Sequence, residues 1–585
     1  MIRVENLSFE VPVKELYRKI SFEIKSGDHC VLIGSNGVGK STLANMICYP
    51  EEYLYDGKIV KENCSRIGYA NQQAKKQQEE ACGVWEFLTE DFASLQLRME
   101  KICEQMAEEN ASEELFEQYQ EVLDLLDAVD GNNYESNIKK QLSLIGLEHL
   151  EKNLVSCISG GEYKLLQLMK EMLMMPDFLI LDEPDAFLDF GNLDSLKKLI
   201  NSYKGTLLVI THNRYLLNHC FNKILHLENK ELQEFEGNYT EYGQALLLKK
   251  IDNKEQAAAE QEEIERTEKM VDRMQKEASR ADIASLGRAL HAKQTHLERL
   301  RKRAIKEPFL EVNHPKIKLP CPEPISEDNK KVLLKVEDYS LEFDEVLLQG
   351  ISFEIEEGEK IAMVGPNGSG KTTLLHHIFQ GKLKNIHKAE ECEIGFLSQR
   401  EQEIFTESNT VSEEIGIWGP DTEKEKETIL KEYCFDKEVL KQKISRLSGG
   451  EKNLLQLLRI QLSGANLLLL DEPTSHLDTY SQVALEEAIN EYQGAVLMVT
   501  HDYNTIVNCA DYVLLVEDKG IRKMRMRTFR KMIYEQYFSK DYLELADKKK
   551  ELEGRIISCL QKKDISSARK LWDMLDDTIL KMNVI

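Results

Sequence analysis

Two glycine-rich segments of the 585-residue chain have the residue types and spacing that hold a phosphate chain. Both fit G-x-x-x-x-G-K-[ST], in which backbone N–H groups turn toward the anion and the lysine reaches the β- and γ-phosphates. A helix start follows each loop, and its partial positive charge suits phosphate. The candidate nucleotide-contacting residues are Gly34, Ser35, Asn36, Gly37, Val38, Gly39, Lys40, Ser41 and Thr42, and Gly365, Pro366, Asn367, Gly368, Ser369, Gly370, Lys371, Thr372 and Thr373. The sequence therefore predicts two ATP-binding loops, with the hydroxyls of Ser41 and Thr372 on Mg²⁺.

An acidic pair follows an apolar run of four residues in each half of the chain. The pairs are Asp182-Glu183 and Asp471-Glu472. We expect the aspartate to hold Mg²⁺, largely through water, and the glutamate to orient or deprotonate the attacking water. Two surface carboxylates that end a strand are the alternative, which the repeated occurrence disfavours.

A second short glycine motif precedes each acidic pair. It consists of Ser159, Gly160, Gly161 and Glu162 in the first half and of Ser448, Gly449, Gly450 and Glu451 in the second. Serine and glycine amides at a helix start form an anion site. A plain helix cap is the alternative, because serine followed closely by glutamate is a common helix-start signal. The spacing before the acidic pair favours the nucleotide interpretation.

Histidine and glutamine occupy equivalent places in the two halves. His212 and His501 each follow an apolar strand pattern, where we expect them to sense the γ-phosphate. Gln72 and Gln399 end the segments IGYANQ and IGFLSQ, and we expect them to contact Mg²⁺ or the attacking water.

The elements that must position these residues are also repeated. ISFEIKSGDHCVLIGSNGVGKSTL from residue 20 matches ISFEIEEGEKIAMVGPNGSGKTTL from residue 351, and the later motifs follow in the same order. Strand, loop and helix alternate, and the apolar runs indicate parallel strands buried on both faces. The predicted fold class is α/β, with tandem P-loop ATPase domains at residues 1–243 and 331–540.

The segments outside the repeat are mostly polar and helical in pattern. A helical arm is expected within the first domain at about 88–130, either as a solvated hairpin or as a binding arm. Residues 244–306 contain no proline and predict a pair of long helices of coiled-coil type, followed by a proline-rich connector at 307–330. A helical C-terminal extension is expected at 541–585.

Composition limits the class of protein further. Hydrophobic residues make up 42% and charged residues 30% of the chain, which indicates a globular protein with solvated helices. No apolar run reaches the ~18 residues of a membrane span, and the N-terminus does not resemble a signal peptide. The twelve cysteines form no Cys-x-x-Cys pair, so we expect reduced thiols and a cytoplasmic location. The net charge of −26 disfavours broad non-specific binding to nucleic acid.

The order of phosphate loop, glutamine, SGGE, DEP and histidine resembles the nucleotide-binding domains of ATP-binding-cassette (ABC) proteins. The resemblance implies head-to-tail pairing, in which Ser159 faces the ATP held by Lys371 and Ser448 faces the ATP held by Lys40. Asp189 and Asp478 would lie at the seam between the two domains. The fused domains, the charged linker and the segment EGNYTEY from Glu236 are similar to the ABC-F family of ribosome-associated ATPases, whose linker reaches the peptidyl-transferase centre. No second chain is needed, because both cassettes are in one chain.

The linker carries a local excess of positive charge. Residues 279–306 hold eight basic and two acidic side chains, a net +6. Phosphate contacts dominate RNA affinity, so this segment is the expected RNA-facing part. The candidate contacts are Arg280, Arg288, Lys293, Arg301, Lys302 and Arg303. A solvated face with i,i+4 ion pairs is the alternative.

The first copy departs from the family pattern. Asp185-Ala186 replaces the usual Thr-Asn pair after DEP, and Asn213 stands where the second copy has Asp502. Phe343 is the candidate adenine-stacking aromatic of the second copy, and the first copy offers no clear counterpart. We therefore expect unequal ATP sites, with the Glu183 site slower or regulatory.

The expected function is that of an ATPase that binds the ribosome near the tRNA exit and peptidyl sites, contacts rRNA and tRNA, and confers antibiotic resistance by ribosome protection. The alternatives are a housekeeping ABC-F translation factor, the ATPase subunit of a separate membrane transporter, and a DNA-repair or chromosome-associated ATPase. The transporter alternative leaves the basic linker unexplained. The chromosomal one requires zinc-binding cysteines or very long coiled coils, which the sequence lacks.

Overall fold

The structure is a computed structural model. It describes residues 1–11, 14–62, 64, 66–70, 82–108, 113–186, 188–252, 315–320, 331–343, 345–399, 404–537, 540–562 and 564–582, together with five single positions between 255 and 271. Contacts divide the chain into two units, residues 1–238 with 313–530 and residues 239–312 with 531–585. The first unit holds both repeats, here called the first and second cassettes.

A six-stranded sheet with the order β5-β6-β7-β3-β8-β9 forms the centre of the first cassette. The strands are β3 (His29–Ile33), β5 (Ile67–Ala70), β6 (Phe178–Asp182), β7 (Thr206–Ile210), β8 (Lys223–Glu228) and β9 (Glu231–Glu236). All neighbours pair in parallel except β8 and β9. Every residue of β6 and β7 is buried, which explains their continuous apolar runs. The carboxyl ends of β3, β6 and β7 therefore carry the chemical motifs to one edge of the sheet.

A second, antiparallel sheet packs against the same core. It has the order β2-β1-β4, formed by β1 (Ile2–Val11), β2 (Lys14–Ile24) and β4 (Asp56–Lys61). Helix α1 (Lys40–Cys48) shares one hydrophobic cluster with both sheets, with Leu43, Ile24 and Leu32 among its members. This packing fixes the position at which α1, and hence the phosphate loop, begins.

The second cassette repeats this plan. Its sheets have the orders β14-β15-β16-β12-β17-β18 and β11-β10-β13. The strands are β10 (Val332–Glu342), β11 (Val346–Glu356), β12 (Lys360–Val364), β13 (Ile386–Lys388), β14 (Ile394–Leu397), β15 (Leu467–Asp471), β16 (Ala495–Val499), β17 (Tyr512–Glu517) and β18 (Gly520–Arg525). The prediction of a tandem α/β P-loop fold is confirmed.

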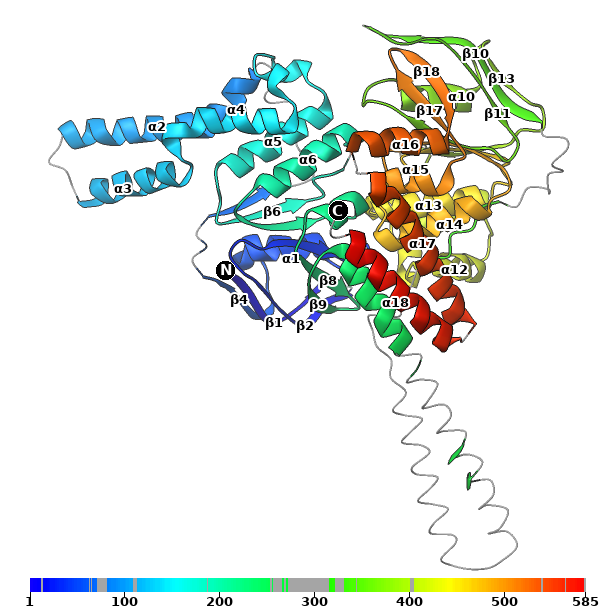
Figure 1. Cartoon of the computed structure of the whole chain (residues 1–585), viewed down its shortest axis with the longest axis horizontal. Coiled ribbons are helices and arrows are strands. Elements are labelled where there is room, and N and C mark those ends of the chain that lie inside the picture. Colours follow the sequence, from blue (N-terminus) through cyan, green and yellow to red (C-terminus); the bar gives the residue numbers. More distant parts are fainter. Residues whose placement is uncertain are drawn as a thin grey trace, which may run out of the picture. The chain divides into compact units, whose positions relative to one another are not determined.

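Helices complete both cassettes (Figure 1). The first has α2 (Val84–Glu108), α3 (Glu113–Ala128), α4 (Tyr134–Ile145), α5 (Gly160–Leu173), α6 (Phe190–Ser202) and α7 (Arg214–His219). The second has α10 (Lys371–Gln380), α11 (Val411–Trp418), α12 (Glu423–Glu432), α13 (Gly449–Gln461), α14 (Thr479–Glu491) and α15 (Tyr503–Cys509). Helices α2 and α3 lie side by side, joined by an ion pair of 3.1 Å between Arg98 and Glu121, where the sequence predicts an arm.

The second unit contains helical residues 239–252, most of α16 (Met526–Tyr537), α17 (Lys540–Gln561) and α18 (Ile565–Met582). Helices α17 and α18 form a hairpin whose buried face includes Leu552, Ile556 and Leu575. Ile251, from the first linker segment, is fully buried in the same cluster. The C-terminal hairpin therefore supports the base of the linker. None of the helices in the described ranges combines the length and apolar character that a membrane-spanning segment requires.

Candidate active site

The two phosphate loops connect a buried strand to a helix start, as predicted. Gly39 and Gly370 cap α1 and α10 with φ of 100° and 88°, a backbone region that favours glycine. Neither helix has a side-chain cap, so its first N–H groups remain available to an anion. Lys40 Nζ donates to the carbonyl oxygens of Gly34 and Ser35 at 2.9 and 3.0 Å. Lys371 repeats this arrangement in the second loop.

The acidic pairs end β6 and β15 at the same edge of each sheet. Asp471 accepts a hydrogen bond of 3.1 Å from the hydroxyl of Thr372, which brings the two predicted Mg²⁺ ligands together. Asp182 accepts one of 3.3 Å from Tyr69. Glu183 and Glu472 have φ of 49° and 48°, in the left-handed region that non-glycine residues seldom adopt. Their backbone N–H groups bond to the neighbouring strands at 2.9 and 2.8 Å, which holds this conformation in place.

The two glutamates differ in electrostatic environment. Burial, together with the negative charge of Asp471, raises the pKa of Glu472 to about 8. Its carboxylate lies 3.5 Å from Nε2 of His501 in the same cassette. Burial also acts to raise the pKa of Glu183, but the imidazole of His476 and the charges of Lys40 and Lys164 together outweigh it and leave the pKa below its usual value. His476 belongs to the second cassette, so the two glutamates have partners of different origin.

Of the predicted phosphate-sensing histidines, His212 is buried and His501 is largely buried. Burial, with Lys40 nearby, lowers the pKa of His212 well below its usual value. Burial, with Lys371 nearby, lowers the pKa of His501 to about 4. Within the described residues, neither ring nitrogen of His212 has a hydrogen-bond partner. A buried imidazole N–H without a partner fits a phosphate oxygen, because burial of an unsatisfied donor costs free energy.

The SGGE motifs begin α5 and α13 as capping boxes. The hydroxyl of Ser159 accepts from the N–H of Glu162, whose carboxylate accepts from the N–H of Ser159. Ser448 and Glu451 make the same pair of bonds. The helix-cap interpretation therefore holds in both copies, and the glycine amides that follow remain at the exposed end of a helix dipole.

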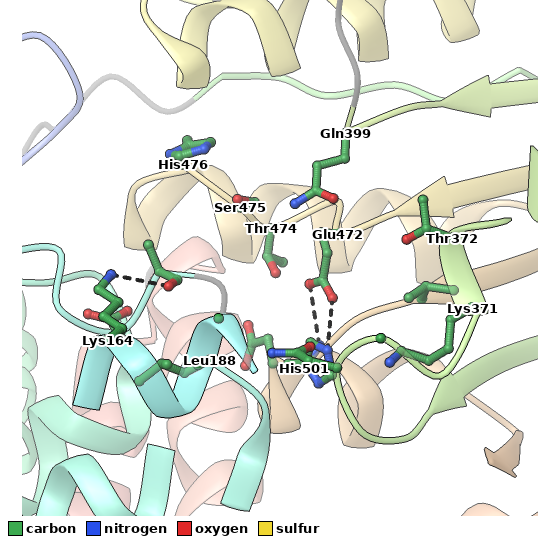
Figure 2. Close-up of a pocket in the computed structure, with 18 of the residues that line it drawn as sticks. Lys164, Leu188, Lys371, Thr372, Gln399, Glu472, Thr474, Ser475, His476 and His501 are labelled. Atoms are coloured by element: carbon green, nitrogen blue, oxygen red, sulfur yellow. Dashed lines mark hydrogen bonds and ion pairs between the residues drawn. The ribbon is translucent and has the colours of Figure 1, made fainter. Parts of the chain in front are cut away.

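One cavity of about 660 Å³ brings motifs of both cassettes together. Gly160 and Gly161 of the first cassette line it, opposite residues 367–373 of the second phosphate loop. Figure 2 shows Lys164 and Leu188 on one side, and Lys371, Thr372, Gln399, Glu472 and His501 on the other. The SGGE segment of one cassette and the phosphate loop of the other therefore share one pocket.

Hydrogen bonds between the cassettes occur at both phosphate loops. The N–H of Asn36 donates to Asp478 at 2.8 Å, and its side-chain amide donates to the carbonyl oxygen of His476 at 2.6 Å. The N–H of Asn367 donates to Asp189 at 3.4 Å. The contacts at the first loop are shorter, so the seam differs between the two sites.

Lys164 occupies the place that Asn453 has in the second SGGE motif. Its ammonium group donates to the carbonyl oxygens of Glu183 at 2.9 Å and Ala186 at 3.2 Å. Asn453 donates to the corresponding turn, at the carbonyl oxygens of Pro473 and Ser475. A charged side chain thus replaces a neutral one beside the turn that follows Glu183.

Asp185 accompanies this change, where the second cassette has Thr474. Burial raises the pKa of Asp185 to about 6, against the hydrogen bond from Thr211 and the charge of Lys164. The Thr211 hydroxyl donates to Asp185 at 2.6 Å and accepts from the N–H of Asn213. Lys164 and Asp185, which replace the Asn453 and Thr474 of the second cassette, are therefore coupled electrostatically.

Several predicted site residues lie away from the pocket or outside the described residues. Phe343 is 64% exposed and does not line the cavity. Gln72 and the six basic linker candidates lie outside the described residues. Sequence reasoning did not single out Lys164 or His476. Alignment of SGGEYK with SGGEKN could have identified Lys164, because the second cassette has an asparagine, Asn453, at the same position.

Two cassettes with complementary motifs at one pocket define a tandem ATP-binding-cassette ATPase, a protein that binds and hydrolyses ATP. A family model described as ABC transporter matches residues 17–186 and 348–475, and an extension model with the same description matches residues 225–318. The chain is 30% identical to ABC transporter F family member 5 of Arabidopsis thaliana, over 88% of this chain and 75% of that protein. The chain belongs to the ABC-F family.

Other similarities agree with this assignment. The chain is 29% identical to the ABC transporter ATP-binding protein YfmM of Bacillus subtilis, over 86% of this chain and 95% of that protein. Among solved structures it is similar to an archaeal ribosome recycling factor in complex with a ribosomal stalk protein, with a TM-score of 0.50 and 16% identity. That match covers 91% of this chain and 92% of the other, and at this identity it concerns the fold.

Proposed function

We propose that this ABC-F protein is a ribosome-binding ATPase that acts near the tRNA exit site and the peptidyl-transferase region and protects ribosomes from antibiotics. The observation that carries the proposal is the pocket shared by Gly160, Gly161 and the Lys371 loop. A pocket completed by both cassettes couples nucleotide binding to their closure. Relatives in the F family, and an archaeal ribosome recycling factor of similar fold, support the ribosome as the target.

ATP and Mg²⁺ fit the residues of both sites. Backbone N–H groups at the starts of α1 and α10 suit the phosphates, and the paired oxygens of Thr372 and Asp471 suit a hard cation. Ser41 and Asp182, with Gln72, would hold the ion of the first site, and Gln399 would join Thr372 and Asp471 in the second. Mg²⁺ would neutralise charge on the phosphates when bound.

Different residues of the chain would have different roles in hydrolysis at each site. Glu183 and Glu472 would orient or deprotonate the attacking water, and His212 and His501 would contact the γ-phosphate. ATP binding closes the cassettes and holds the ribosome-bound state, and hydrolysis releases it. The linker at 244–306, supported at its base by α17 and α18, acts on the target.

A double variant tests ribosome binding. Glu183→Gln with Glu472→Gln retains the phosphate loops but removes both proposed bases, so it should accumulate on 70S ribosomes in ATP. Co-sedimentation measures this, with ADP as the nucleotide control and Lys40→Ala with Lys371→Ala as the control for ATP binding. No ATP-dependent shift of the double variant into the ribosome fraction would refute ribosome binding.

Growth assays test the protective role. A sensitive bacterial host that expresses the protein is expected to survive higher concentrations of at least one peptidyl-transferase inhibitor than the same host expressing the double variant. An unchanged inhibitory concentration across the whole panel, with ribosome binding intact, would favour a housekeeping translation factor.

A further inference from the structure

The hairpin of β17 and β18 in the second cassette carries an unusual charge for this chain. We call residues 517–527 the basic hairpin. It contains five basic and two acidic side chains, a net +3 within a chain of net −26. Strand β18 is the outer strand of the six-stranded sheet, so one of its edges has no neighbouring strand in that sheet. Lys519, Arg522, Arg525 and Arg527 are exposed.

The basic side chains of the hairpin differ in whether they contact other residues of the cassette. Lys523 lies 3.1 Å from Glu359 and 4.7 Å from the centre of the Tyr512 ring. By contrast, the side chains of Lys519, Arg522, Arg525 and Arg527 have no ion-pair or hydrogen-bond partner in the described part of the chain. Contacts within the fold therefore explain the presence of Lys523, but they do not explain the three arginines.

The first cassette provides an internal comparison. Residues 228–238 form the equivalent hairpin of β8 and β9, with the same lengths of strand and turn. They contain one basic and four acidic side chains, a net −3. The fold therefore accepts either sign of charge at this edge, and the positive sign belongs to the second cassette alone.

We propose that the basic hairpin is a docking surface for an RNA backbone, with Arg522, Arg525 and Arg527 contacting phosphates. This inference rests on ribosome binding as the proposed function. Arginine offers a planar fork of donors that matches phosphate oxygens, and such contacts position a protein on nucleic acid without reading its bases. The strongly acidic remainder of the chain repels a polyanion, so a local positive edge would determine which face of the protein turns toward the RNA. The alternative occupant, an acidic protein surface, would present carboxylates to the same arginines.

Charge removal in the double Gln background tests the surface. Arg522→Gln, Arg525→Gln and Arg527→Gln together should weaken ribosome binding at least about tenfold and reduce the slope of log affinity against log salt by about 2. The matched control removes the same charge from exposed positions elsewhere in the cassette, as Lys382→Gln, Lys384→Gln and Lys388→Gln. That control should retain the parent affinity and slope.

A second measurement identifies the contacted molecule. A photo-crosslinking amino acid in place of the exposed Thr528 should form crosslinks to rRNA. Crosslinks to ribosomal protein alone would overturn the assignment to RNA. Equal affinities and slopes for the arginine variant and its parent would overturn the docking surface, whereas failure of the parent itself to bind ribosomes would refute the proposed function instead.

Discussion

Nδ1 of His476 in the second cassette lies 3.7 Å from Oε2 of Glu183 in the first. His476 has a φ of 59°, and its carbonyl oxygen accepts the side-chain amide of Asn36, so one residue contacts both the proposed base and the phosphate loop of the other cassette. The sequence counterpart of His476 in the first cassette is Phe187, which cannot pair with a carboxylate. Glu183 therefore has an imidazole partner from the other cassette, whereas the imidazole beside Glu472, that of His501, belongs to its own cassette.

His476→Phe should raise the pKa of Glu183, because it removes the imidazole that opposes burial. In a Glu472→Gln background, only the Glu183 site hydrolyses ATP. The alkaline shift of its pH–rate profile should be on the order of one unit. An unchanged profile would mean that His476 leaves Glu183 once ATP is bound.

The single Gln variants should retain unequal ATPase rates. A general base is most effective when its pKa lies near the working pH. Glu472, with a pKa of about 8, meets this condition better than Glu183, whose pKa is lowered. Glu472→Gln, which leaves the Glu183 site, should therefore be slower than Glu183→Gln by about tenfold, a modest effect of base strength. Steady-state phosphate release measures both, and identical residual rates would contradict asymmetry.

The same variants should shift the stability of the nucleotide-free protein in opposite directions. Glu472 has its folded-state pKa raised from 4.5 to about 8, so its contribution to stability is lost as the pH rises through that window. Glu472→Gln should raise the Tm, increasingly from pH 5 to pH 8, with an upper bound of about 5 kcal/mol in the free energy of unfolding. Glu183 has a lowered pKa, so its contribution is present at neutral pH and lost in acid. Glu183→Gln should lower the Tm at pH 8 and have less effect at pH 4.

Lys164 and Asp185 should behave as a coupled pair. Lys164→Asn leaves Asp185 buried without its nearby cation, and Asp185→Thr leaves a buried ammonium group, so each single change should cost about 2 kcal/mol. The double variant restores the neutral combination of Asn453 and Thr474, and it should recover about 1–3 kcal/mol relative to the sum. Urea denaturation measures the cycle. Strict additivity would show that the two substitutions are independent.

The C-terminal hairpin offers a comparison of adjacent residues. Ile556 is fully buried in the cluster that contains Ile251, whereas Ile557 is 50% exposed. Ile556→Ala should destabilise the second unit by about 2–5 kcal/mol and speed hydrogen exchange at residues 239–252. Ile557→Ala is the control and should have little effect. Equal exchange in both variants would show that the hairpin does not support the linker base.

The amino-acid sequence by itself determined the tandem α/β fold and the positions of its motifs. Each phosphate loop, acidic pair and SGGE segment is a local pattern tied to a strand end or helix start, and the repeat of that order in both halves is visible without coordinates. The capping boxes at Ser159 and Ser448 follow from the same local rules.

Only the tertiary structure decided which residues act on one another. His476 and Glu183 are far apart in the chain, and no local pattern specifies a contact between their side chains. The opposite pKa shifts of Glu183 and Glu472 likewise arise from burial and from neighbours supplied by other elements, although both residues follow the same apolar run and aspartate. Local periodicity determines elements, whereas the electrostatics of a site depend on the three-dimensional packing that brings distant charges together.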